Sequence, residues 1–228
     1  MVAVLAACSG GTDAMVRTLQ QVVRRDGGIA GVQLNSNFRY LRITVAGRVA
    51  LMVLGSVDSL PQGAVEVWYS SQREVLRFQN GRTVGAVGLT TEWREVVLPA
   101  LPSWSELART GQPFRWSRVR DVMPGYSFGV IDSLVLRVIS PPRKTEMLGV
   151  DPQGLTWFEE QVEPGERVGG LMATGMAGVD KLLPPARYAV DFRGGKETVV
   201  YGEQCLAADL CFTWQRWPVV VDGSAGKG

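Results

Sequence analysis

Apolar and polar residues alternate along most of this chain, and that period of two is typical of half-buried β-strands. In residues 40–45, Leu41, Ile43 and Val45 share one face, and a turn at 46–47 leads into 48–54. The segment 48–54 is apolar on both faces. We therefore expect the core of a sheet on one side of it and a helix or loops on the other.

Turn residues divide the pattern into hairpins. Asn80-Gly81 separates strands predicted at 74–79 and 82–87, and this dipeptide strongly favours a two-residue type I′ turn. Gly194-Gly195-Lys196 is expected to join strands at 188–192 and 197–201 in the same way. Further strands are predicted at 114–121, 126–139 and 155–162.

Two helices are predicted in addition to the strands. The apolar spacing predicts an amphipathic N-terminal helix at about 13–26, capped by Thr12 or Asp13 and packed on a sheet. Ser103 and Glu106 have the spacing of a capping box for a short helix that ends at Gly111.

The elements together predict an all-β, mainly antiparallel fold. We expect a strongly curved sheet or barrel-like sandwich, closed by one N-terminal helix and short helices. A single β-rich domain would span 9–217, after a signal or lipobox remnant at 1–8 and before a flexible tail at 218–228. The glycine-rich segment 163–185 is expected to be a long loop or lid.

The chain of 228 residues contains no histidine. Ser-His-Asp triads and histidine-bearing zinc sites are therefore excluded. The G-x-S-x-G sequence at 125–129 matches a nucleophile elbow, but the β-branched residues that follow it indicate a strand, so we interpret Pro124-Gly125 as a turn. Glu159 and Glu160 are adjacent in a strand and would point to opposite faces, so they cannot act as a pair.

Composition adds further limits. The formal net charge is +2 with basic and acidic residues interspersed, which gives no indication of nucleic-acid binding. The lysine at 194–196 lacks the upstream glycine and the following Ser or Thr of a phosphate-binding loop. We predict no enzyme activity, metal or cofactor.

Leu5-Ala6-Ala7-Cys8 resembles the lipobox of bacterial lipoproteins, in which the cysteine becomes the lipidated first residue. Lipidation at Cys8 would tether the protein to a membrane without spanning it, and no apolar run reaches the roughly 20 residues of a transmembrane helix. The segment lacks a basic n-region, which indicates a start codon placed too late or numbering that begins inside the signal. The alternative is an ordinary apolar N-terminus with Cys8 as a buried thiol.

The two other cysteines, Cys205 and Cys211, are expected to form a disulfide across the loop 206–210, in an oxidising compartment. Two unpaired structural thiols are the alternative.

Several short motifs follow one another along the chain: Cys8 with the helix after it, Tyr40-Leu41-Arg42, 48–55, Asn80-Gly81-Arg82, 87–89, Trp116-Ser117-Arg118, 157–160 and 188–191. In this order they resemble the YjbF/GfcB lipoproteins, which are encoded with capsule and exopolysaccharide secretion genes in Gram-negative bacteria. The resemblance implies an outer-membrane lipoprotein that faces the periplasm, with a curved or barrel-like antiparallel sheet. It implies an accessory role in polysaccharide export. The expected partners are outer-membrane lipid through acylated Cys8, envelope proteins including an outer-membrane barrel, and the polysaccharide itself. No catalytic residues come with it.

The cysteine pair and the segment 163–185 depart from that pattern. Two other functions stay open: a module that binds a glycan or lipid tail in a half-barrel, and a polysaccharide-cleaving enzyme with acidic and tyrosyl groups. Aromatic faces can stack on sugars. The candidates are Trp68, Trp93, Trp104, Trp116, Trp157, Trp214 and Trp217.

Overall fold

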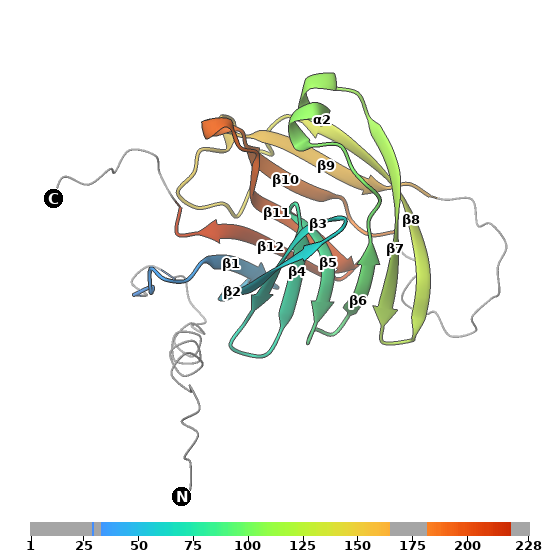
Figure 1. Ribbon diagram of the computed structural model, residues 1–228, viewed down its shortest axis with the longest axis horizontal. Helices are drawn as coiled ribbons and strands as arrows, with labels where there is room; N and C mark the ends of the chain where they lie inside the picture. Colours follow the sequence, from blue (N-terminus) through green and yellow to red (C-terminus); the bar gives the residue numbers. More distant parts are fainter. Residues whose placement is uncertain (1–28, 30–32, 165–181, 220–228) are drawn as a thin grey trace, which may run out of the picture.

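The computed structural model describes residues 29, 33–164 and 182–219. In this part of the chain, twelve strands form a closed antiparallel barrel, in which each strand pairs with its sequence neighbours and β12 pairs with β1 (Figure 1). The predicted all-β antiparallel class is confirmed. The strands are β1 (Tyr40–Val45), β2 (Arg48–Leu60), β3 (Gly63–Tyr69), β4 (Val75–Gln79), β5 (Arg82–Val87), β6 (Glu92–Val97), β7 (Phe114–Met123), β8 (Ser127–Ile139), β9 (Thr156–Val162), β10 (Ala186–Asp191), β11 (Thr198–Ala207) and β12 (Leu210–Trp217).

Tight turns set the register of the barrel. Asn80 and Gly81 both have positive φ, 48° and 80°, as the predicted type I′ turn requires. Gly81 is also the residue that the packing demands, because a Cβ there would lie 2.7 Å from the Val199 side chain. The chain reverses again at 193–195, where a short 3-10 turn joins β10 and β11 as expected.

The predicted strand pattern was incomplete around β2, β3 and β6. β2 continues to Leu60, and its outer half pairs with β3, which the pattern did not predict. β6 was also missed. Residues 55–60 include two serines, a glycine and an aspartate and are largely exposed, so this hairpin lacks the alternation on which the sequence reasoning relied.

Helix α2 (Trp104–Thr110) lies over one end of the barrel (Figure 1). Ser103 caps it by accepting a hydrogen bond from the backbone N–H of Glu106, and Gly111 ends it with φ 62°. The predicted short helix is therefore confirmed. Trp104 points into the barrel, with its ring centroid 4.8 Å from that of Phe158 and 5.2 Å from that of Tyr188.

Two smaller clusters cover parts of the outer wall. Leu51 and Val53 of β2 pack on Tyr40 and Ile29, so the second face of 48–54 is covered by the preceding segment, as predicted. The segment between β8 and β9, which includes the 3-10 turn Pro152–Gly154, packs around Trp157 and Tyr201. The N-terminal helix predicted at 13–26 and most of the 163–185 loop lie outside the described residues.

Candidate functional site

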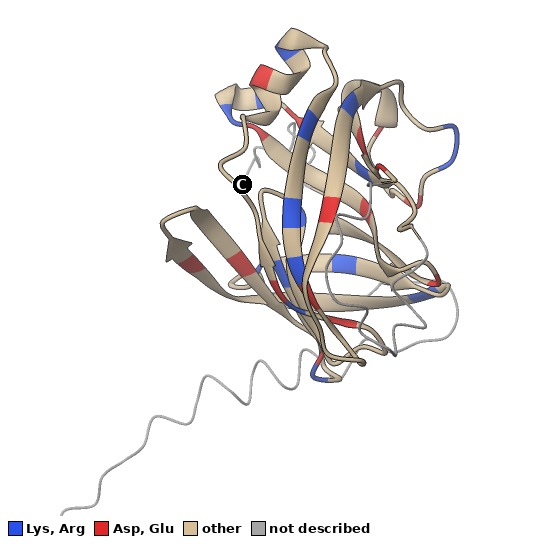
Figure 2. Cartoon of the chain, turned by 90° about the vertical axis from the view of Figure 1, so that its right-hand side faces the viewer, with Lys and Arg blue, Asp and Glu red and all other residues tan. Residues whose placement is uncertain are grey.

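Five charged side chains lie inside the barrel, and all are less than one-tenth exposed. Arg82 comes from β5, Arg118 and Arg120 from β7, Asp132 from β8 and Glu160 from β9. The period of two explains their position, because each charged residue shares the inward face of its strand with apolar neighbours. Figure 2 looks onto the side of β7 and β8 and shows basic bands on one strand beside an acidic band on the next.

Ion pairs connect these side chains. Asp132 accepts hydrogen bonds from Nε of Arg118 and Nε of Arg120, both at 2.7 Å, and a third from Nη2 of Arg120 at 3.1 Å. Glu160 accepts from Nε of Arg82 at 3.0 Å and lies 3.9 Å from Nη1 of Arg118. Arg118 therefore links the two carboxylates into one network.

Three guanidinium groups face two carboxylates in this network, which leaves one formal positive charge in excess. Aromatic rings stabilise these positive charges through cation–π contacts. The guanidinium of Arg82 lies 4.0 Å from the Trp104 ring centroid, and those of Arg118 and Arg120 lie 4.6 and 5.1 Å from that of Trp93. Nη2 of Arg82 is buried and has no hydrogen-bond partner among the described residues.

The surroundings shift the pKa of two members of this region. Burial alone would raise the pKa of Asp132, but the hydrogen bond from Arg120 and the charges of Arg118 and Arg120 outweigh it and lower that pKa below its usual value. Burial, with a smaller contribution from the charge of Glu160, raises the pKa of Tyr188 well above its usual value. Asp132 therefore stays ionised and Tyr188 stays neutral.

Neutral hydrogen bonds cross the interior beside the charges. Oε1 of Gln204 on β11 accepts from the backbone N–H of Thr83 at 2.9 Å and from its hydroxyl at 2.8 Å, while Nε2 of Gln204 donates to the Gly81 carbonyl. Trp93 donates from Nε1 to the Leu206 carbonyl at 3.0 Å. These bonds join β5 and β6 to β11, which is not their neighbour in the sheet.

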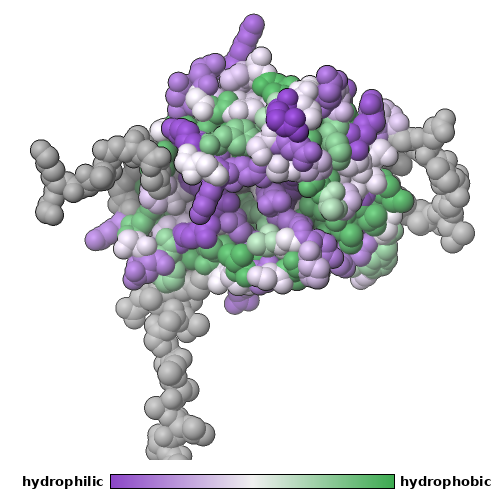
Figure 3. Space-filling model, turned by 45° about the horizontal axis from the view of Figure 1, so that its top comes forward, coloured by the Kyte–Doolittle hydropathy of each residue, from purple (hydrophilic) through white to green (hydrophobic). Residues whose placement is uncertain are grey.

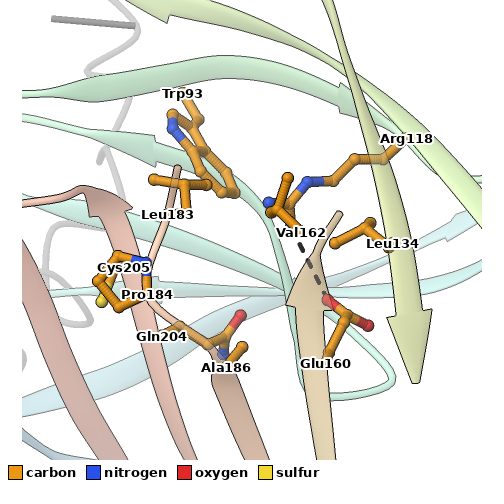
Figure 4. Close-up of a pocket in the computed structure, with 10 residues that line it drawn as sticks. All are labelled: Trp93, Arg118, Leu134, Glu160, Val162, Leu183, Pro184, Ala186, Gln204 and Cys205. Atoms are coloured by element: carbon orange, nitrogen blue, oxygen red, sulfur yellow. Dashed lines mark ion pairs between the residues drawn. The ribbon is translucent and has the colours of Figure 1, made fainter. Parts of the chain in front are cut away.

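A small cavity adjoins the network (Figure 4). Arg118 and Glu160 point toward each other on one side of it, while Trp93 and Leu183 lie together on another. Its volume is about 10 Å³. That is close to the roughly 10–15 Å³ needed for a single water and far below the roughly 300–1,000 Å³ of a small-molecule site. This arrangement is therefore suited to holding the barrel closed and rigid.

A second cavity, of about 110 Å³, lies beside β5 and β6. Val84 of β5 and the end of β6 line it, together with Leu60 and Gln62 of the β2–β3 hairpin. Sequence reasoning did not predict this cavity, because it depends on a hairpin and a strand that the pattern did not show.

An apolar row lies on the outer wall. Val97, Val119 and Ile131 are neighbours across β6, β7 and β8, and all three are exposed. Tyr126 and Phe128 extend it toward the β7–β8 turn, with ring centroids 6.5 Å apart. Figure 3 shows hydrophobic residues on the right-hand side of the molecule, where β7 and β8 lie, and also elsewhere on this face.

The structure places several of the predicted residues. Cys205 and Cys211 are cross-strand neighbours in the β11–β12 hairpin and form the expected disulfide. Glu159 and Glu160 point to opposite faces as predicted, with Glu159 paired to Arg187 at 3.0 Å. Residues 124–126 form a turn before β8, as predicted for the G-x-S-x-G segment. Cys8 lies outside the described residues.

The tryptophans are mostly core residues. Six of the seven are buried, and Trp217 is half-buried against the cluster beside β1 and β2. The six buried rings are therefore not available to stack on a sugar at the surface of the described barrel.

Within the described ranges, no group of three or more acidic, cysteine or histidine side chains is placed to hold a metal ion. None of the helices described has the length and apolar character needed to cross a membrane.

The fold thus defines a class: a closed, up-and-down antiparallel barrel whose interior is filled by aromatic side chains and an ion-pair network. The crystal structure of the hypothetical lipoprotein YmcC from Escherichia coli (K12) has a similar fold, with a TM-score of 0.57 and 16% sequence identity over 95% of this chain and 100% of that chain. At this identity the likeness shows the fold alone. No protein-family model matches the chain, and no curated protein matches it.

Proposed function

We propose that this protein is a lipid-anchored accessory component of exopolysaccharide or capsule secretion, facing the periplasm from the outer membrane and acting as an interaction partner beside an outer-membrane barrel. The observation that carries the role as an interaction partner is the filled interior. Trp93, Trp104 and the five charged side chains occupy the space in which a hollow barrel would hold cargo. The barrel therefore acts through its outer surface and its attachment.

Attachment through Cys8 is supported by the lipobox at the start of the chain. The fold similarity to a protein described as a lipoprotein is consistent with it. A disulfide between Cys205 and Cys211 fits an oxidising compartment such as the periplasm. The role in polysaccharide export rests on the resemblance to the YjbF/GfcB lipoproteins.

The alternative of a binding module has less support. A lipid tail or a sugar chain needs a site of several hundred Å³. The open cavity at β5 and β6 holds about 110 Å³, and the tryptophans are largely buried.

The first test is the intact mass of the protein extracted in detergent from its own host, before and after reduction. We expect acyl mass on a chain that begins at Cys8 and a gain of two hydrogens on reduction. An unmodified chain with free thiols would overturn both the anchoring and the compartment.

The second test replaces the gene with a Cys8→Ser variant in the host. We expect the variant to leave the outer-membrane fraction and secreted polysaccharide to fall, while a Ser9→Ala variant behaves as wild type. Unchanged polymer secretion in a strain that lacks the protein altogether would refute the role in export.

A further inference from the structure

The outer half of β2 extends beyond the strand that pairs with its first half. β1 pairs with β2 only as far as Val53. One further hydrogen bond, of 2.9 Å from the Leu54 N–H to the Arg39 carbonyl, completes this side of β2. Beyond it, residues 55–60 have no partner on the β1 side within the described part of the chain.

The segment before β1 does not continue along this edge. The Phe38 N–H donates to the Asn35 carbonyl and closes a turn. Leu34 and Phe38 then pack on the outer cluster that includes Leu51. They therefore cover the face of the first half of β2 and leave the edge of its second half free.

Both faces of the outer half are in water as well. Every residue of β2 from Gly55 to Leu60 is exposed, and among the described residues these six pair with β3 alone. In Figure 2 this hairpin projects to the left of the barrel wall. An exposed strand with an unpaired edge is a template for a further strand.

The β2–β3 turn shows which backbone groups face the edge. Leu60 and Gly63 flank this two-residue turn and are paired, so the hydrogen-bonding groups of Leu60 point toward β3. The direction alternates along a strand. Asp58 therefore also bonds toward β3, whereas the N–H and C=O groups of Val57 and Ser59 point to the open edge.

The charge at the edge indicates what can pair there. Asp58 lies between Val57 and Ser59, accepts a hydrogen bond from the Ser56 hydroxyl at 3.0 Å, and has no ion-pair partner among the residues described. If two copies of the chain paired antiparallel through all of these backbone groups, Asp58 would lie opposite itself. Like charges directly opposite one another are destabilising, whereas opposite charges stabilise the pair. The edge is therefore suited to a basic segment of another protein.

We propose that the outer half of β2 binds an extended segment of a partner protein, which adds one strand to the β2–β3 hairpin and places a Lys or Arg opposite Asp58. Strand addition of this kind obtains its affinity from main-chain hydrogen bonds. Val57 and Leu60 are 46% and 43% exposed and point to opposite faces, so the added strand would also bury apolar surface on both faces. The proposal rests on the proposed role as an interaction component and names the surface that would carry it.

The test uses the folded protein, with its disulfide intact, and a random dodecapeptide library displayed on phage. We expect the selected peptides to share a stretch rich in β-branched residues around one Lys or Arg. The same library selected on the Asp58→Lys variant should instead yield Asp or Glu at that position, because the charge at the edge is reversed.

Two variants at one position test the main-chain hydrogen bond. Val57→Pro removes an N–H that faces the open edge, whereas Val57→Ala shortens the same side chain and keeps the N–H. We expect a synthetic selected peptide to bind Val57→Pro about threefold or more weakly than Val57→Ala. Proline is tolerated where the N–H side of an edge strand faces solvent, so both variants should keep the urea midpoint close to that of wild type.

Several results would overturn the inference. They are failure to enrich any binder, equal binding of the peptide by Val57→Pro and Val57→Ala, and selection of the same basic peptides by wild type and Asp58→Lys. A wild-type dimer in sedimentation that Val57→Pro converts to monomer would assign the edge to a second copy of this chain instead. Any of these results, obtained while Cys8→Ser still impairs secretion, would reject the β2 edge and leave the proposed function standing.

Discussion

Glu160 and Glu159 provide a direct test of the internal network, because they are adjacent in β9 and point to opposite faces. The Glu160 side chain is 1% exposed and paired with Arg82, whereas that of Glu159 is 26% exposed and paired with Arg187. Replacing each with Gln removes one negative charge and keeps the shape of the side chain. Only the Glu160→Gln variant leaves a buried guanidinium without its carboxylate.

The expected magnitudes differ clearly. Removing one partner of a buried ion pair costs about 3–5 kcal/mol, while a partly exposed pair contributes about 0–1 kcal/mol. Glu160→Gln also raises the positive excess inside the barrel, because three guanidinium groups would then face Asp132 alone. For a protein of this size each kcal/mol corresponds to roughly 2–4 °C, so we expect a fall in Tm of roughly 6–20 °C.

The assay is urea unfolding followed by tryptophan emission, with the disulfide intact, for wild type and both variants. A loss of less than about 1 kcal/mol for Glu160→Gln, or equal losses for both variants, would refute the reasoning. An Arg82→Met, Glu160→Met double variant distinguishes the contribution of the ion pair from the cost of leaving one buried charge unpaired. We expect it to be less destabilised than the sum of its single variants, since both charges then leave the interior together.

The remaining predictions concern pH and the disulfide. The pKa of Asp132 is lower in the folded protein than in the unfolded chain. Its stabilising contribution is therefore present above about pH 4 and is lost as the pH falls through the folded-state pKa. The free energies of unfolding of Asp132→Asn and wild type should converge in acid. Because the pKa of Tyr188 is raised, stability should fall as the pH rises above about 10, with a smaller slope in Tyr188→Phe than in a Tyr69→Phe control. Loop closure across the six-residue separation predicts a loss of about 2 kcal/mol for a Cys205→Ser, Cys211→Ser variant in urea unfolding, and wild type under reduction should match it.

The sequence predicted the parts of the barrel that local interactions determine. Residues 40–45, which alternate cleanly, and residues 82–87, which follow the Asn80-Gly81 turn, are strands with the expected bounds. The helix after Ser103 was predicted from its capping box, which is also a local signal. Closure of β12 on β1 was not predictable in this way, because it joins segments at opposite ends of the barrel sequence.

The 110 Å³ cavity illustrates a second kind of omission. It needs the outer half of β2, which is rich in polar residues, and it needs β6, whose charged residues at 94 and 95 interrupt the alternation. A pattern of apolar and polar residues cannot show which strands meet around a cavity, because that depends on how the strands pair in the sheet.

The sequence does contain a signal of the internal network: charged residues occupy positions of the strand alternation that are otherwise apolar. In β7, Arg118 and Arg120 occupy the same phase of the alternation as Trp116 and Val122, so either the arginines are buried or the tryptophan is exposed. Glu160 shares the apolar phase of β9 in the same way.

A lone charge in such a position would be too costly to bury. Charges of opposite sign in the apolar phase of several strands can satisfy one another, provided that the strands face a common interior. The coincidence of Arg118, Arg120 and Glu160 in that phase therefore favours a closed barrel over an open curved sheet. In an open sheet, one face would have to leave these same residues, and Trp116 in the same phase of β7, in water.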